Sequence, residues 1–534
     1  MPARRIAVIG AGSSGLTALK CCLDEGLEPV CFERTGYIGG LWHFTNESTE
    51  GQACVMRSTV INTSKEMMCY SDFPIPAEFA IYMHNTKVDR YLNMYAEKFG
   101  LRKYIRFHIE VVHVKIGSEP GKWEVTTRTK NADDVTTEIY DGVLVCTGHH
   151  ADKNIPAFPS IDKFRGRVVH THDYKDFRGY EDKRVLIIGI GNSGGDVATE
   201  LSRISSQVYL STRSGSWIFN RVDKGGDPVD MRNSTRFMKT LRRRLPSSWA
   251  NKLLEMRLNG RFDHAKYSLR PSYPPFAAHP TINDELPNRI ASGGVIVKPN
   301  VKEFTENGVI FEDDSVEDDI DEVVLATGYI FGFPFLDKSI TEVKDNKVNL
   351  YKYMFPPDLQ HPTLAIIGCF QPLGAIMPLS EMQCRLATRV FTGDVQLPSR
   401  QHMFDDIRRK QEEMAGRYNA SLRHTIQVEY IPFMDELAEL IGCKPDIKKL
   451  LLSDPMLALK CYFGPATPYQ YRLRGPGPWA GAREHIFTQW ERTYLPLRTR
   501  PVKGGNLTET SGNTYLLLFV IVLIMAYLLY MLCD

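Results

Sequence analysis

Several patterns that would indicate metal or disulfide chemistry are missing from this sequence of 534 residues. Eleven cysteines are scattered along it, but none forms a Cys-x-x-Cys pair, so neither a zinc site nor a dithiol redox centre is indicated. No paired carboxylates, Ser–His–Asp set or metal-ligand spacing stands out. The net charge is only +2, which gives no support to nucleic-acid binding. Reduced thiols in a protein that faces the cytosol fit this cysteine usage best.

The two ends of the chain differ sharply in hydrophobicity. Residues 5–10 read as a strand with no hydrophobic leader before it, which argues against a secretory signal. Residues 515–532 are an uncharged apolar run, close to the length of about 20 residues that a helix needs to cross a bilayer. A buried core helix is the alternative, but such a helix rarely stands at a bare terminus. We therefore expect residues 513–534 to form a membrane anchor, with the body of the protein on the cytosolic side.

What the sequence does contain is a glycine-rich turn between an apolar strand and a helix-like run. The turn consists of six residues, Gly10, Ala11, Gly12, Ser13, Ser14 and Gly15. Glycine at these spacings permits a tight turn and a close approach of the backbone to a pyrophosphate, while the helix start offers free N–H groups. The next strand ends at Glu33, where a carboxylate can bind a ribose diol. The pattern predicts a dinucleotide site, which we assign to FAD.

The same design recurs near residue 190. Its members are Gly189, Gly191, Asn192, Ser193, Gly194, Gly195 and Asp196, of which Asn192, Ser193 and Asp196 are suited to capping the helix and contacting the ligand. The following strand leads to Arg213 instead of an acid, and Arg221 comes shortly after. A guanidinium binds a 2′-phosphate, which a carboxylate would repel, so this second site is predicted to take NADPH.

Two dinucleotide sites in one chain imply electron transfer between their ligands, from nicotinamide to flavin. Two further apolar strands end in Thr-Gly, at Thr147-Gly148 and Thr327-Gly328. We expect these to be the points where the chain crosses between the two nucleotide-binding units.

At this point the residues resemble a known family, the flavin-containing monooxygenases of the vertebrate microsomal type. The most specific motif is F-x-G-x-x-x-H-x-x-x-Y, filled by Phe164, Gly166, His170 and Tyr174. Further similar stretches are residues 38–42, 61–68 and 370–374, and the segments around Asn62 and 146–150 are most like the fifth vertebrate form. The resemblance covers essentially the whole chain. Ser214 stands where some relatives have a second arginine, which leaves open how the 2′-phosphate is held.

The resemblance implies an α/β fold with two Rossmann-like domains, a helical insertion that covers the substrate, and a C-terminal transmembrane helix. The expected boundaries are 1–155 and 329–445 for the FAD domain, 156–215 and 291–328 for the NADPH domain, 216–290 for the insertion, 446–512 for a packed tail and linker, and 513–534 for the anchor. Within the tail, residues 465–501 read as irregular because they are rich in proline and glycine.

The resemblance also implies a reaction cycle and a set of site residues. NADPH reduces FAD, O₂ adds to the reduced flavin as a C4a-hydroperoxide, and a nucleophilic substrate takes the distal oxygen. Asn62 is the predicted catalytic residue, because a neutral amide can donate to a peroxide and orient NADP⁺ without supplying a proton. A turn asparagine or a glycosylation sequon are the alternatives. His170 is expected to be structural. Further predicted contacts are Gly40, Leu41, Trp42, Asn62, Thr63 and Gln371 for FAD, and Ile61 for NADPH.

The expected substrates are small lipophilic amines, sulfides or ketones. Baeyer–Villiger oxygenation, an NADPH oxidase that releases H₂O₂, and a nucleotide-binding redox sensor remain open, whereas a disulfide reductase lacks its dithiol. The endoplasmic reticulum is the expected membrane, and a homo-oligomer is left open. Residues 231–270 hold eleven Lys/Arg against Glu255 and Asp263, so this basic stretch is either a second membrane contact or a solvated helical face.

Overall fold

Two five-stranded parallel sheets organise the computed structural model, which describes residues 4–130, 134–418 and 425–501. The first has the order β20-β7-β1-β2-β3. Its strands are β1 (Arg5–Ile9), β2 (Glu28–Glu33), β3 (Ile105–Phe107), β7 (Gly142–Val145) and β20 (Leu364–Ile366). The central strands are buried on both faces, which explains why they read as continuous apolar runs.

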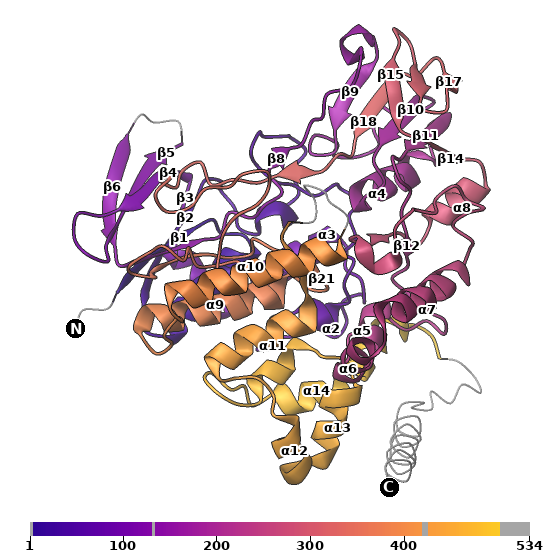
Figure 1. Cartoon of the computed structure of the whole chain (residues 1–534). Helices are drawn as coiled ribbons and strands as arrows, with labels where there is room; N and C mark the ends of the chain where they lie inside the picture. Colours follow the sequence, from indigo (N-terminus) through magenta and orange to yellow (C-terminus); the bar gives the residue numbers. More distant parts are fainter. Residues whose placement is uncertain (1–3, 131–133, 419–424, 502–534) are drawn as a thin grey trace.

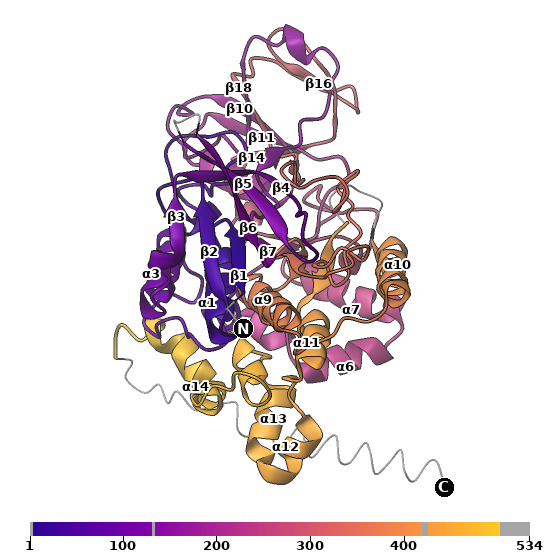
Figure 2. The same cartoon turned by 90° about the vertical axis from the view of Figure 1, so that its left-hand side faces the viewer.

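The second sheet has the order β14-β11-β10-β18-β9. Its strands are β9 (Arg167–His170), β10 (Arg184–Ile188), β11 (Gln207–Ser211), β14 (Val295–Lys298) and β18 (Glu322–Leu325). Figure 2 shows this sheet at one end of the molecule, with the first sheet below it. Each sheet thus collects strands from distant parts of the chain, as expected for nested nucleotide-binding units.

Smaller strand groups flank and connect the two sheets. Antiparallel sheets are formed by β4 (Ile109–Ile116), β5 (Trp123–Thr129) and β6 (Val135–Tyr140), and by β15 (Val301–Phe304), β16 (Val309–Phe311) and β17 (Val316–Glu317). Two-stranded pairs are β8 (Asp152–Lys153) with β19 (Tyr329–Ile330), β12 (Ile218–Phe219) with β13 (Thr281–Ile282), and β21 (Gln371–Leu373) with β22 (Gln427–Glu429). The β8–β19 pair lies between the two sheets (Figure 1).

Helices cover the sheets and fill the insertion. The helices before the insertion are α1 (Ser13–Asp24), α2 (Lys65–Met68), α3 (Asn85–Lys98) and α4 (Asn192–Leu201), and those in and just after it are α5 (Val229–Asn233), α6 (Arg236–Arg244), α7 (Ser247–Asn259) and α8 (Leu286–Ala291). The later helices are α9 (Met377–Thr392), α10 (Arg400–Arg417), α11 (Tyr430–Ile441), α12 (Ile447–Ser453), α13 (Pro455–Phe463) and α14 (Ala482–Tyr494). Short 3-10 turns are η1 (Gly40–Trp42), η2 (Leu101–Tyr104), η3 (Ile161–Lys163), η4 (Pro275–Ala277), η5 (Pro468–Arg472) and η6 (Leu495–Leu497).

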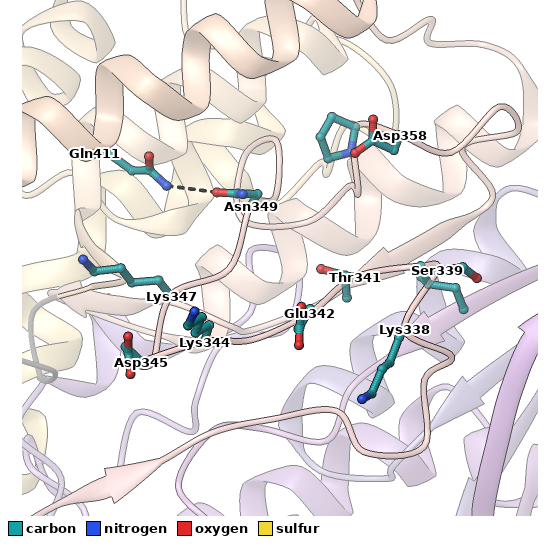
Figure 3. A pocket seen from close by; sticks show the side chains of 12 residues that line it. Lys338, Ser339, Thr341, Glu342, Lys344, Asp345, Lys347, Asn349, Asp358 and Gln411 are labelled. Atoms are coloured by element: carbon teal, nitrogen blue, oxygen red, sulfur yellow. Dashed lines mark hydrogen bonds between the residues drawn. The ribbon is translucent and has the colours of Figure 1, made fainter.

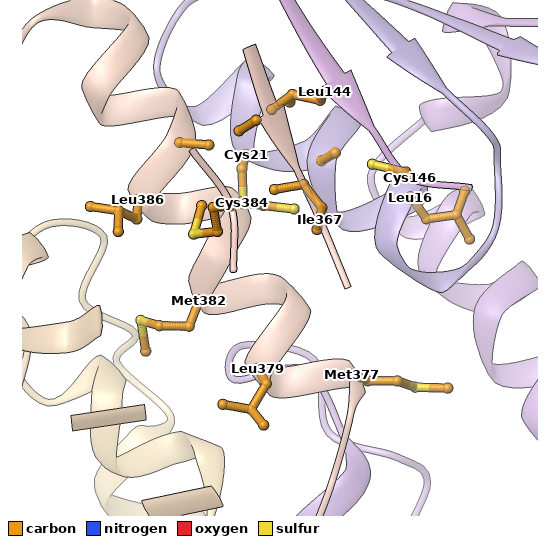
Figure 4. Close-up of a cluster of buried hydrophobic side chains, with 14 of the residues drawn as sticks. Leu16, Cys21, Leu144, Cys146, Ile367, Met377, Leu379, Met382, Cys384 and Leu386 are labelled. Atoms are coloured by element: carbon orange, nitrogen blue, oxygen red, sulfur yellow. The ribbon is translucent and has the colours of Figure 1, made fainter. Parts of the chain in front are cut away.

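Helix α9 packs against α1, the helix that starts at the first glycine turn (Figure 4). Leu16 and Cys21 of α1 are fully buried, as are Leu379 and Cys384 of α9. The ten cysteines within the described ranges are free thiols, and nine of them are buried. A helix some 360 residues further along the chain therefore packs behind the first glycine turn. Burial of each large apolar side chain contributes about 1.5–3 kcal/mol to the stability of the fold.

One expectation for the C-terminal part is wrong in detail. Residues 465–501 were expected to be irregular, yet α14 spans 13 of them. The proline- and glycine-rich stretch ends at Gly481, the residue before the helix, and no proline or glycine follows until Pro496. Ile486, Gln489 and Thr493 are buried at helical spacing, so tertiary packing stabilises the helix.

None of the helices in the described part of the chain is both long enough and apolar enough to cross a bilayer. The predicted anchor, residues 513–534, lies outside the described residues.

Candidate cofactor and catalytic site

The first glycine turn has the close backbone contacts that its sequence predicts. Gly10 has a φ of +97°, and a Cβ on Gly15 would lie 1.8 Å from the carbonyl oxygen of Gly10. A side chain at either position would therefore distort the turn. Helix α1 begins at Ser13, directly after Gly12, and no side chain caps it. Its first N–H groups are free to bind phosphate oxygens.

Glu33 stands at the end of β2 and faces this turn. Its Oε2 accepts a hydrogen bond from the Ala11 N–H at 2.8 Å, and its Oε1 accepts from the Thr35 N–H and hydroxyl, each at 2.8 Å. A carboxylate has about four acceptor positions, so one remains for a ribose hydroxyl. The residue thus both braces the turn and fits the predicted diol contact.

The predicted stretch Gly40–Trp42 lies against the same turn. The Gly39 N–H donates to the Ala11 carbonyl at 3.0 Å, and a Cβ on Gly40 would lie 3.1 Å from the Cα of Gly12. From the other side, a Cβ on Gly368 would lie 2.8 Å from Ser14 Oγ and 3.3 Å from Ser380 Oγ. The Ser380 hydroxyl is buried and has no hydrogen-bond partner within the described ranges.

These features fit a polar, phosphate-bearing ligand such as FAD. Gln371 lies three residues after Gly368, at the start of β21, and its amide oxygen accepts from Gln427 Nε2 at 2.5 Å. Gln371 was predicted to lie close to the flavin. Only three residues separate it from Gly368 in sequence, but no described contact links it directly to the first turn.

The second glycine turn repeats this geometry. Gly189 has a φ of +109°, and a Cβ on Gly194 would lie 2.0 Å from the Gly189 carbonyl oxygen. Asn192, Ser193 and Asp196 were expected to cap the helix, but that is wrong: Gly191 precedes α4 and no side chain caps it. The Asn192 Oδ1 accepts instead from the Ile282 N–H of the insertion at 2.8 Å. The helix N–H groups are consequently left free for a phosphate.

Asp196 of α4 faces the insertion as well. Its Oδ1 accepts from Asn283 Nδ2 at 3.1 Å. Burial raises the pKa of Asp196 to about 7, against the opposing effect of the Arg221 charge. At a pH near 7 this carboxyl group is therefore only partly ionised, so that it repels a neighbouring dinucleotide phosphate less than a full negative charge would.

The two candidate phosphate-binding arginines have different surroundings. Arg213 is exposed just beyond β11, and no described residue forms an ion pair with it. Arg221 is 13% exposed and its Nη1 is ion-paired with Asp284 Oδ2 at 2.8 Å. Its Nη2 donates to the Asn62 Oδ1 at 2.7 Å. Arg213 is thus available to an anion, whereas Arg221 already has a carboxylate partner.

Asn62 lies in a turn that is bonded to the insertion and lies in the same chain segment as Tyr70, which contacts the first glycine turn. Arg221 of the insertion donates to Asn62. Tyr70, eight residues after Asn62 in the chain, donates its hydroxyl hydrogen to the Ser13 carbonyl at 2.7 Å, at the start of α1. Because a guanidinium only donates, the Asn62 oxygen must face Arg221. No described residue accepts a hydrogen bond from its Nδ2, which leaves this group to donate to a ligand. Ile61 and Thr63 beside it are buried.

The two Thr-Gly segments lie where the chain passes between the two sheets, as predicted, and each begins against a glycine turn. A Cβ on Gly10 would lie 2.8 Å from the Cys146 carbonyl oxygen, and one on Gly189 would lie 2.5 Å from that of Ala326. The chains that follow pair with each other as β8 and β19. The crossovers therefore run side by side between the two sheets.

His170 holds this junction together. Its Nδ1 accepts from the His172 N–H at 3.1 Å, so its Nε2 carries the proton and donates to the Gly328 carbonyl at 3.1 Å. Burial lowers the pKa of His170 to about 4. Both ring nitrogens are engaged and the ring is neutral, which agrees with the expected structural role and leaves no nitrogen to act as a base.

Several polar residues of the insertion that contact the Asn62 turn or the second glycine-turn helix were not predicted from the sequence. Asp230, Asn283 and Asp284 all belong to the insertion, and Asp230 accepts hydrogen bonds from Ser64. Ser64 is 166 residues from Asp230 and Arg221 is 63 residues from Asp284, so no local motif marks these contacts.

A separate surface pocket of about 500 Å³ contains none of the predicted site residues. It is lined largely by polar side chains, among them Lys338, Glu342, Lys344 and Gln411, and the Gln411 Nε2 donates to Asn349 Oδ1 at 3.1 Å (Figure 3). This pocket is distinct from the two glycine turns.

Two Rossmann units that carry glycine turns and are joined by paired crossovers define a flavoprotein that binds two dinucleotides. The model of one family, flavin-binding monooxygenase-like, matches residues 3–533. The chain belongs to this family, which confirms the resemblance, and it is a flavin-dependent monooxygenase that uses FAD, NADPH and O₂.

Curated relatives match along nearly the full chain. Flavin-containing monooxygenase 5 of Mus musculus is 53% identical, covering 99% of this chain and 98% of the relative. The N-oxide-forming dimethylaniline monooxygenase 2 of Oryctolagus cuniculus is 48% identical, covering 98% of each.

Solved structures share the fold. The S-allyl-L-cysteine S-oxygenase of Allium sativum has a TM-score of 0.64 at 24% identity, covering 92% of this chain and 98% of that one. Cyclohexanone monooxygenase from Rhodococcus, bound to NADP⁺, has a TM-score of 0.58 at 17% identity, covering 83% and 98%.

Proposed function

We propose that this monooxygenase transfers one oxygen atom to the nitrogen or sulfur of small lipophilic amines and sulfides. The observation that carries the proposal is Asn62, whose Nδ2 is left free to donate in a turn that the insertion holds through Arg221. Bound FAD supplies the redox chemistry with O₂, which side chains cannot perform. The amide donates a hydrogen bond without releasing a proton, so it stabilises charge beside the flavin without promoting loss of H₂O₂.

The domain assignment follows from the strands that share each sheet. In this proposal residues 1–155 and 329–445 hold FAD, because β20 joins the sheet of β1. Residues 156–215 and 291–328 hold NADPH, because β9, β14 and β18 join the sheet of β10 and β11. The insertion, residues 216–290, supplies Arg221 and Asp284 beside Asn62, which supports its placement over the substrate.

The substrate class can be tested directly with ¹⁸O₂. Purified enzyme with NADPH is offered a tertiary amine, a thioether or a ketone, and the products are analysed by mass spectrometry. We expect an N-oxide and an S-oxide that each carry one ¹⁸O atom. An ester from the ketone alone would favour Baeyer–Villiger oxygenation, and H₂O₂ without any oxygenated product would leave an NADPH oxidase.

We also propose attachment to the endoplasmic reticulum membrane through residues 513–534, assisted by the insertion. Helices α6 and α7 support the second contact, because Trp249, Leu253 and Met256 are exposed beside basic side chains. Several of those basic groups are already paired, for example Arg242 with Glu429 and Arg257 with Asp223. Since each basic contact with an anionic surface contributes up to ~1 kcal/mol, the remaining attraction is modest.

Removal of residues 515–534 tests this second contact. The truncated protein is expected to keep weak, salt-sensitive binding to phosphatidylserine vesicles, because α6 and α7 remain. Trp249→Ala combined with Leu253→Ala should then abolish the residual binding in a co-sedimentation assay. If the truncated protein with both side chains intact does not sediment with the vesicles at all, the insertion makes no membrane contact.

A further inference from the structure

Residues 221–230 of the insertion form a hairpin-like segment with both of its ends together. Val222 bridges Pro228, and the Val229 N–H donates to the Arg221 carbonyl at 2.9 Å. Gly225 and Gly226, both with positive φ, form the tip. Arg221 and Asp230 therefore lie together at the same end of the segment, although they are nine positions apart in the sequence.

These two side chains hold opposite ends of the Asn62 turn. Arg221 donates to the Ile61 carbonyl at 3.2 Å and to the Asn62 Oδ1 at 2.7 Å. The Asp230 Oδ2 accepts from the Ser64 N–H at 2.7 Å and from the Ser64 Oγ–H at 2.8 Å. Backbone and side chain of Ser64 are thus both bound to one carboxylate oxygen, which fixes the position of the residue as well as the direction of its amide.

The carboxylate of Asp230 has no cationic partner among the described residues. Its Oδ1 accepts only the Met231 N–H, at 3.0 Å, and burial raises the pKa of Asp230. A buried carboxylate that is bound only by neutral donors is costly to maintain, so a non-polar or amide side chain would serve better if the segment needed packing alone. A carboxylate at this position is instead suited to accepting the two hydrogen bonds from Ser64.

The far side of the turn is fastened independently. Helix α2 follows Ser64 directly, and its Glu66 accepts from Arg492 Nε at 3.1 Å and from the Tyr469 hydroxyl at 2.8 Å. The Lys65 ammonium donates to the Phe79 carbonyl at 2.8 Å. The turn therefore lies between a fixed helix and the insertion, and Asp230 is the anionic group that joins them.

We propose that Asp230 is a positioning residue for Asn62: through Ser64 it fixes the turn so that the Asn62 amide points at the flavin site. The inference deepens the proposed function and rests on the role given there to Asn62. It assigns the insertion a second task, because the segment proposed to cover the substrate also sets what fraction of NADPH turnover yields oxygenated product and water instead of H₂O₂.

The test uses the full-length, FAD-loaded enzyme and the variants Asp230→Asn and Ser64→Ala. Asparagine offers one oxygen where the carboxylate offers two, so it cannot accept from both Ser64 and Met231. In both variants the fraction of NADPH electrons released as H₂O₂ should rise several-fold with substrate present. Since the variants remove the same interaction, the double variant should be no worse than the more affected single one.

Hydrogen exchange of the peptide that contains Ser64 supplies a readout independent of turnover. Loss of a hydrogen bond to a charged group costs about 1.5 kcal/mol or more, so the Ser64 amide of Asp230→Asn should exchange about ten-fold faster. Asp141→Asn is the matched control, because Asp141 also accepts a backbone N–H, from Arg5 at 2.8 Å, but stands just before β7, beside the end of β1 that is remote from the glycine turn.

The outcomes separate this inference from the function on which it rests. If Asn62→Ala releases H₂O₂ while Asp230→Asn and Ser64→Ala behave like Asp141→Asn, Asp230 does not position the turn and the inference is overturned. If Asn62→Ala itself does not change H₂O₂ release, the role of Asn62 fails first. Should Asp230→Asn not fold, Ser64→Ala and its exchange rate decide alone.

Discussion

Asn62→Ala is expected to turn the enzyme largely into a source of H₂O₂ while leaving reduction of the flavin by NADPH intact. The reason is geometric: Arg221 holds the amide oxygen at 2.7 Å, so the Nδ2 is the group left to donate towards the ligands. Removal of a single pre-oriented donor of this kind costs on the order of 10²-fold in the step that it assists. Parallel assays of NADPH consumption, H₂O₂ and oxygenated product measure the change.

Asn93→Ala is the appropriate comparison for this variant. Asn93 is an asparagine on α3 whose amide donates to the Asp89 carbonyl at 2.9 Å, outside the Asn62 turn. We expect its product yield per NADPH to equal that of the unchanged enzyme. An Asn62→Ala enzyme with the same yield would remove the catalytic role proposed for this residue.

Arg213→Ala is expected to reduce the preference for NADPH over NADH. Arg213 is exposed at the end of β11 and has no ion-pair partner in the described part of the chain, so its charge is available to a 2′-phosphate. A hydrogen bond between charged groups contributes about 1.5–3 kcal/mol, and its loss should lower the ratio of the two kcat/KM values roughly ten- to hundred-fold. Steady-state assays with both cofactors give this ratio.

Two further variants locate the phosphate. Arg203→Ala removes an exposed arginine near the end of α4 that is paired with Glu285, and it should leave the ratio unchanged. Arg221→Ala is expected to increase H₂O₂ release more than it alters the ratio, because Arg221 is bound to Asp284 and Asn62. If instead Arg221→Ala abolishes the preference and Arg213→Ala does not, the phosphate is held by Arg221.

Much of the fold was accessible from short sequence windows. Both glycine turns, their flanking strands and the position of Glu33 at a strand end were predicted correctly, because each strand–turn–helix unit encodes its own backbone geometry within about 30 residues. The crossovers at Thr147 and Thr327 were also predicted. Helix α14 was missed, since its stability comes from burying Ile486 and Thr493 against distant elements and not from a strong local pattern.

The candidate site shows the same division. Asn62 and Arg213 were singled out as candidate site residues from their place in motifs, whereas the partners of Asn192 and Arg221 were not predicted. Asn192 binds the Ile282 N–H, 90 residues away, and Arg221 binds Asn62, 159 residues away. No window of sequence contains both members of such a pair, so local propensity cannot indicate which of several polar groups will meet.

The chain's own pattern of glycines and apolar strands is enough to specify two nucleotide-binding units and a dinucleotide as the kind of ligand that they take. This holds because a phosphate is bound by backbone N–H groups whose geometry is local. The side chains that orient the Asn62 amide are decided only by the tertiary structure, in which the insertion packs against residues 60–66. Contacts of that kind depend on how distant segments pack, and the free energy of that packing is shared across the whole core.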